Sequence, residues 1–124
     1  MLGNIIIVLA AGGFALMGIG AIVKPNVVTQ QFGIPELSAA GRSEIRGVYG
    51  GFGLAMVAIL VVALVIPDLR TGITITAAVA LLGMAAGRII SALIDRSLPR
   101  VALLYLLIEV VMGALLLVAR NPTS

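Results

Sequence analysis

Ionisable side chains inside apolar segments are the groups in this sequence that could do chemistry. Arg88 and Glu109 each interrupt a long apolar run, and the polar stretch Arg42–Gly51 leads directly into another. A charged side chain in a membrane is costly, and such groups usually pair with one another or serve a function. These residues are therefore the candidates for a site, and the helices that carry them must bring them together.

The composition indicates an integral membrane protein. Of 124 residues, 61% are hydrophobic and 10% are charged, whereas soluble domains are roughly half apolar and a quarter charged. A spanning helix needs about 20 mostly apolar residues, so the chain has room for four spans. We expect one domain over residues 1–124, an all-α integral membrane antiparallel four-helix bundle, with spans at about 5–23, 44–66, 72–94 and 101–119.

The same composition argues against several kinds of site. Cys and His are both missing, which removes disulfides, the usual zinc sites and His-ligated haem. We therefore expect neither a metal nor a cofactor. The net charge is +3, but the Lys and Arg residues are scattered singly and form no basic stripe, so we expect no nucleic acid partner.

Small residues at helical spacing predict where helices approach closely. One stripe lies in the first span, and GxxxG pairs lie in the second and third spans. Such faces serve packing within the bundle, a homo-oligomer, or docking onto a larger membrane complex. The residues concerned are Ala11, Ala15 and Gly18, then Gly47 and Gly51 with Ala55, then Gly83 and Gly87.

The longest connection is predicted to contain a short interfacial helix. Pro25 suits the first helical position, and Val27, Val28 and Phe32 would form its apolar side at the membrane surface. This segment would be a lid over the polar site or a plain connector. The other connections, Pro67–Arg70 and Asp95–Arg100, are predicted to be tight turns.

Helical geometry predicts that the separated charges meet. Consecutive spans joined by short turns are antiparallel, and reflection about the third turn leaves Arg88 about 3 Å of helical rise from Glu109. Counting 100° per residue, Arg46, Tyr49, Gly50 and Gly53 share one face, as do Tyr105 and Glu109. We predict a ligand-binding cluster with acidic residues at its mouth, while the opposite half of the bilayer stays purely apolar. The cluster comprises Arg46, Tyr49, Arg88, Tyr105 and Glu109, with Glu44 and Asp95 at the mouth.

This cluster is compatible with several functions. In the leading hypothesis it binds a membrane lipid or small amphipathic molecule, whose anionic or polar head contacts Arg46 and Arg88. Alternatively, Glu109 is the proton donor or acceptor of an intramembrane enzyme, an isomerase or cyclase of a hydrophobic substrate. That reaction requires Glu109 to be free of Arg88, as it would be if Arg88 paired with Asp95. A balanced charge network that only fixes helix register, or a non-catalytic subunit of a membrane complex, is also compatible with the sequence.

Loop charges predict the orientation. Short cytoplasmic loops are rich in Lys and Arg, and the end of the bundle that carries the polar cluster has more of them than the end that carries the termini. We therefore expect both termini to lie outside the cytoplasm. The residues compared are Lys24, Arg42, Arg96 and Arg100 against Arg70 and Arg120.

The whole chain resembles a family of small four-helix bacterial membrane proteins called domain of unknown function 4345, which implies a multi-pass protein of the bacterial inner membrane but no particular activity. Ser43 stands where the family pattern has Asn, which weakens any role for an amide there. A more remote similarity to four-helix DoxX-like proteins is architectural. The matching motifs are Pro25 with Phe32-Gly33 and Pro35, the stretch Arg42–Gly51, Gly87-Arg88, Asp95 with Pro99, and Glu109.

Overall fold

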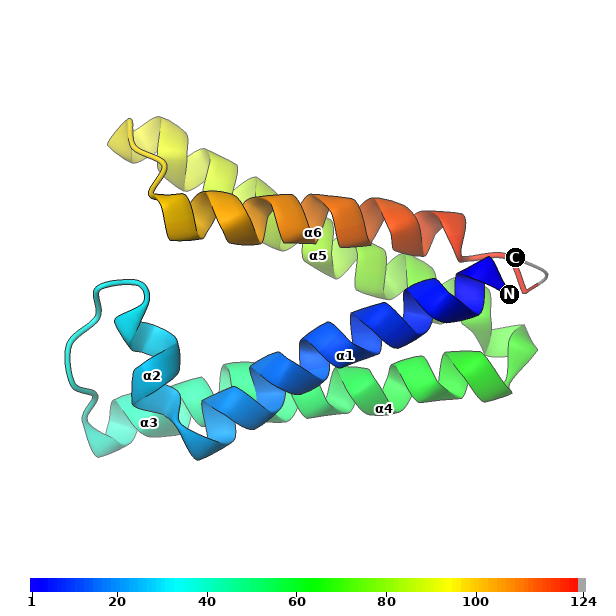
Figure 1. The fold of residues 1–124 in the computed structure, drawn as a ribbon, viewed down its shortest axis with the longest axis horizontal. Coiled ribbons are helices and arrows are strands. Elements are labelled where there is room, and N and C mark those ends of the chain that lie inside the picture. The colour runs from blue at the N-terminus through cyan, green and yellow to red at the C-terminus, as the bar shows by residue number, and fades with distance from the viewer. Residues whose placement is uncertain (123–124) are drawn as a thin grey trace. The chain divides into compact units, whose positions relative to one another are not determined.

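The computed structural model describes residues 1–122 and is all-α (Figure 1). Over these residues, four helices are long and apolar enough to cross a membrane: α1, the continuous helix Ala39–Val65, α5 and α6. The predicted fold class, an all-α membrane protein with the helices of a four-helix bundle, is confirmed. The elements are α1 (Leu2–Val23), α2 (Pro25–Gln30), α3 (Ala39–Ile45), the π-helix η1 (Arg46–Gly51), α4 (Phe52–Val65), α5 (Pro67–Asp95) and α6 (Arg100–Val118).

The second and third spans each begin five residues earlier than predicted (44 − 39 and 72 − 67). The second span starts at Ala39 because Ser38 caps it, its Oγ accepting a hydrogen bond from the Gly41 N–H at 3.1 Å. The third span starts at Pro67, a residue that suits the first helical position. The prediction of a tight turn at Pro67–Arg70 is therefore wrong, since these residues form the first turn of α5.

The chain divides into two compact units. We call residues 1–7 with 62–124 the terminal unit, and residues 8–61 the middle unit. The terminal unit holds α5, α6 and the beginning of α1, whereas the middle unit holds the rest of α1 with α2, α3, η1 and most of α4. The single domain expected from the sequence stays a prediction, and each unit is described by itself.

Glycines bring α1 close to η1 and α4 in the middle unit. A Cβ added at Gly53 would lie 2.9 Å from the Phe14 carbonyl oxygen and from Gly18 Cα, and one added at Gly18 would lie 3.0 Å from the Gly50 oxygen. A Cβ at Gly47, in contrast, would meet no atom within 4 Å. The predicted packing role of the small stripe at Gly18 is confirmed, but α1 approaches the face of Gly50 and Gly53 rather than that of the GxxxG pair Gly47 and Gly51.

The turn at Arg46–Gly51 is a π-helix. The Phe52 N–H donates to the carbonyl of Gly47, five residues earlier, so this turn contains one residue more than an α-helical turn. The count of 100° per residue nevertheless places Arg46, Gly50 and Gly53 on one face and Gly47 and Gly51 on another, in agreement with the contacts to α1. The glycines permit this wide turn next to α1.

In the terminal unit, α5 and α6 are antiparallel and lie side by side (Figure 1). They pack tightly at Gly113, where an added Cβ would lie 2.9 Å from Leu82 Cγ and 3.4 Å from the Ala78 carbonyl oxygen. A Cβ at Gly83 or Gly87 would meet no atom within 4 Å, so the predicted GxxxG pair of α5 does not form this contact. Gly113 therefore fixes the level at which the two helices meet.

Candidate functional site

A two-point ion pair joins α5 to α6. Arg88 Nε donates to Glu109 Oε1 at 2.8 Å, and Arg88 Nη2 donates to Oε2 at 3.1 Å. The Glu109 side chain is 5% exposed and that of Arg88 is 26% exposed. The carboxylate is thus buried behind a half-buried guanidinium. The predicted meeting of Arg88 and Glu109 is confirmed.

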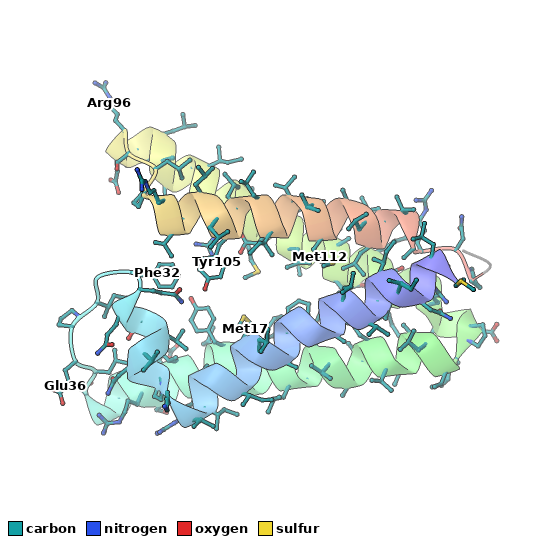
Figure 2. The ribbon with its side chains drawn as sticks, viewed as in Figure 1. Met17, Phe32, Glu36, Arg96, Tyr105 and Met112 are labelled. Atoms are coloured by element: carbon teal, nitrogen blue, oxygen red, sulfur yellow. The ribbon has the colours of Figure 1, made fainter. Side chains whose placement is uncertain are left out.

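Tyr105 completes this group. Its ring centroid lies 5.4 Å from Arg88 Cζ, within cation–π distance. Tyr105 is one helical turn before Glu109, so both side chains leave α6 toward α5. Figure 2 shows Tyr105 and Met112 projecting from one side of α6. We call Arg88, Tyr105 and Glu109 the paired-charge site.

The position of this site follows from the packing of α5 on α6. With Gly113 level with Ala78 and Leu82, antiparallel helices bring Arg88 close to the level of Tyr105. Side chains on a helix lean toward its N-terminus, so Arg88 reaches back along α5 to the level of Glu109. The same lean lets its guanidinium cross the Tyr105 ring on the way. One helix contact therefore places all three groups.

The charged stretch of the second span forms its own contacts in the middle unit. Arg46 Nε donates to the carbonyl of Ile22 near the end of α1 at 2.9 Å, and Arg42 Nη1 donates to the carbonyl of Leu37 at 2.8 Å. Cationic side chains near a helix C-terminus satisfy its free carbonyls and oppose its dipole. Of the four residues predicted to share one face, Arg46, Gly50 and Gly53 contact α1, while the place of Tyr49 on this face stays a prediction.

The remaining predicted site residues are exposed. Tyr49 is 39% exposed, and Glu44 and Asp95 lie exposed on α3 and at the end of α5. Arg46, Tyr49 and Glu44 belong to the middle unit, whereas the paired-charge site and Asp95 belong to the terminal unit. The five-residue cluster with its acidic mouth therefore stays a prediction. Residues 1–122 contain no group of three or more acidic side chains placed to hold a metal.

A second buried arginine was not predicted. Arg70 is 5% exposed; its Nη1 donates to Asn4 Oδ1 at 2.7 Å and its Nε to the Ala119 carbonyl at 3.1 Å. Nearby, the Thr71 hydroxyl donates to the carbonyl of Arg120 at 2.7 Å. We call Asn4, Arg70, Thr71, Ala119 and Arg120 the terminal cluster. This cluster lies at the ends of α1, α5 and α6, and the purely apolar half of the bilayer opposite the paired-charge site stays a prediction.

The sequence did contain part of the signal for this cluster. Pro67 at the first helical position followed by an acidic residue is a helix start, and that start places Arg70 inside the first turn of α5. One of its two acceptors is the backbone carbonyl of Ala119, which no side-chain pattern reveals. The contacts also join the beginning of α1 to the end of α6, so these two helix ends lie at one end of the terminal unit.

In the paired-charge site, Arg88 is more accessible to another molecule than Glu109. Both oxygens of Glu109 accept hydrogen bonds from Arg88, so neither is left without a partner within the site. The guanidinium is the more exposed partner, so it is the group that another molecule would meet first.

Comparison with known proteins adds the family. No curated protein and no solved structure matches the chain. The profile described as "Domain of unknown function (DUF4345)" matches residues 2–120, nearly the whole chain. The chain, with its four apolar helices and its paired charges, therefore belongs to the domain of unknown function 4345 family.

Proposed function

We propose that this membrane protein binds a lipid or another small amphipathic molecule, whose polar or anionic head contacts the guanidinium of Arg88. The observation that carries the proposal is the ion pair in which a buried Glu109 holds a half-buried Arg88 against the ring of Tyr105. Arg46 and Tyr49 are proposed as further contacts of the head.

The electrostatics of the pair support this role. A lone charge within a membrane is costly, but a charge held by a hydrogen-bonded partner is less so. Glu109 fixes one edge of the guanidinium and Tyr105 covers part of one face, so Arg88 is held in one orientation. A guanidinium that is already oriented loses less entropy when it binds a phosphate or carboxylate.

The surroundings suit the apolar part of such a molecule. Large apolar side chains next to Arg88 and Glu109 along both helices are exposed in the structure, and an acyl chain can pack on them while its head reaches the guanidinium. They are Ile89 at 46%, Ile90 at 56%, Leu107 at 54% and Ile108 at 48% exposure.

An acid–base enzyme has less support. Proton transfer requires a carboxyl oxygen within hydrogen-bonding reach of the substrate, whereas both oxygens of Glu109 accept hydrogen bonds from Arg88. The arrangement with Arg88 on Asp95, which would have left Glu109 free, is not the one in the structure. No observation favours the enzyme over binding.

The test is lipid retention measured by native mass spectrometry in detergent. Wild type and the double variant Arg88→Met with Glu109→Leu are compared, because replacing both partners leaves no unpaired buried charge and preserves the fold better than either single change. Each is incubated with phosphatidylglycerol or with phosphatidylcholine. We expect wild type to retain at least about tenfold more of the phosphatidylglycerol than the double variant, an effect of the size expected for charge-assisted hydrogen bonds.

Arg96→Gln is the matched control. Arg96 also lies in the terminal unit but is exposed beyond α5 and points away from the helix pair (Figure 2), so its loss removes the same charge without touching the site. The control should retain lipid like wild type. Equal retention by wild type and the double variant would refute the proposed function.

A further inference from the structure

Arg70 is a buried cation without a buried anion. Its two observed acceptors, the Asn4 amide and the Ala119 carbonyl, are both neutral. Its third nitrogen, Nη2, is buried and has no hydrogen-bond partner in the structure. None of the described residues 1–122 brings a carboxylate within ion-pair distance of this guanidinium. In this respect Arg70 differs from Arg88, whose charge is balanced by Glu109.

Such an arrangement is energetically incomplete. A buried charge is normally paired, because the effective desolvation penalty is several kcal/mol per ion. Neutral acceptors satisfy donors but do not balance the charge. The terminal cluster therefore provides a strong attraction for an anion that the described part of the chain does not supply.

The helices at this end add to the attraction. Asn4 lies in the first turn of α1 and Arg70 in the first turn of α5, so two helix N-termini, which favour anions, meet here. The opposing C-terminus of α6 is already satisfied by side chains of the same region. Arg70 donates to the Ala119 carbonyl, Thr71 to that of Arg120, and Arg120 to that of Leu117.

We propose that the terminal cluster is a binding site for a phosphate-type oxyanion, supplied either by a phospholipid head or by free phosphate. The anion approaches over Asn4, Thr71 and Arg120, which are exposed, and takes the place of the Asn4 amide beside Arg70. This site is distinct from the paired-charge site, and the proposal does not depend on the proposed function.

Asn4→Asp is the decisive variant. Asn4 Oδ1 already accepts from Arg70 Nη1, and Asp has nearly the same shape, so the change supplies a permanent carboxylate to the guanidinium. Removing the cation by Arg70→Gln also deletes two contacts between helices and risks unfolding, whereas Asn4→Asp retains them. The Asp variant should no longer need an external anion.

Thermal unfolding followed by circular dichroism provides the measurement, in delipidated detergent solution with millimolar phosphate or with phosphatidylglycerol. The references are chloride at equal ionic strength and phosphatidylcholine. We expect phosphate, phosphatidylglycerol or both to raise the wild-type midpoint by roughly 4 °C near saturation. Response to phosphate alone identifies a free anion as the source, and response to the lipid alone identifies its head.

The variants decide the result. Asn4→Asp should unfold at a higher temperature than wild type without anion and show no further rise with it. The control Arg96→Gln and the double variant Arg88→Met with Glu109→Leu should keep the full response, which separates this site from the paired-charge site. Any of three results would overturn the proposal. The wild-type midpoint could rise no more with the anions than in the reference solutions, or the Asn4→Asp midpoint could rise as much as that of wild type. The third such result is a control variant whose midpoint no longer rises with the anion.

Discussion

Arg88 and Glu109 are 21 residues apart in the sequence, yet the Arg88 guanidinium donates hydrogen bonds to both carboxylate oxygens of Glu109. Burial of the two partners is unequal, since the Glu109 side chain is 5% exposed and that of Arg88 is 26% exposed. The carboxylate therefore depends on its partner more than the guanidinium does. This asymmetry leads to a prediction about stability.

Arg88→Ala should destabilise the protein more than Glu109→Ala. Loss of the arginine leaves a buried carboxylate unpaired, a change that typically costs about 3–5 kcal/mol, whereas the half-buried arginine can reach water or lipid heads when Glu109 is lost. The double variant Arg88→Met with Glu109→Leu should recover most of the loss. Thermal unfolding of the four proteins in one detergent measures this, and strictly additive losses in the double variant would contradict it.

Tyr105→Phe and Tyr105→Ala should separate the ring from the hydroxyl. The ring makes the cation–π contact with Arg88, which Phe preserves and Ala removes, so the Ala variant should be less stable than the Phe variant by about 0.5–2 kcal/mol. If the hydroxyl contacts a bound head, Phe should still lower lipid retention in native mass spectrometry. A Phe variant as unstable as the Ala variant would show that the ring contact contributes little.

Gly53→Ala and Gly83→Ala should have opposite effects. A Cβ at Gly53 would lie 2.9 Å from backbone atoms of Phe14 and Gly18, which cannot move aside cheaply, so we expect a loss of about 1–3 kcal/mol. A Cβ at Gly83 meets nothing within 4 Å, and Ala is the better helix former by roughly 0.5–1 kcal/mol. Denaturant unfolding compares them; equal effects would mean that α1 and α4 are not closely packed.

Cysteine cross-linking can test whether Tyr49 joins the paired-charge site. The chain has no cysteine of its own, so a pair introduced at Tyr49 and Tyr105 is the sole reactive pair. The predicted five-residue cluster leads us to expect rapid cross-linking by a short bismaleimide in membranes. Val65 paired with Tyr105 is the control, because it lies about 24 Å along the helix from Tyr49. Cross-linking no faster than in the control would remove Arg46 and Tyr49 from the proposed site.

Some of this structure follows from the sequence alone. Four spans follow from composition and length, and the Arg88–Glu109 pair follows from antiparallel geometry across the short turn before Pro99. Both depend on regular helices joined by short connections, where residue number translates directly into depth. The same regular count places Arg46, Gly50 and Gly53 on the face that contacts α1, whereas the GxxxG motif alone does not show that Gly47 and Gly51 make no close contact with α1.

Arg70 shows a different limit. Its burial depends on where α5 begins and on a carbonyl at the end of α6 that happens to lie within reach. Apolar runs locate the middle of a span well but its ends poorly, and a backbone acceptor leaves no trace in the side-chain pattern. Buried charges near helix ends are consequently harder to predict than those in the middle.

The length of α5 sets how deep the paired-charge site lies. Asp68 and Asp95 are 27 residues apart (95 − 68), about 40 Å of helix, which matches the full thickness of a bilayer with its headgroups. An upright α5 therefore places one carboxylate in each headgroup layer. Arg88, seven residues before Asp95 (95 − 88), then lies about 10 Å inward, only a few Å below the surface of the hydrocarbon. At that shallow level a lipid can touch the guanidinium without leaving its own leaflet.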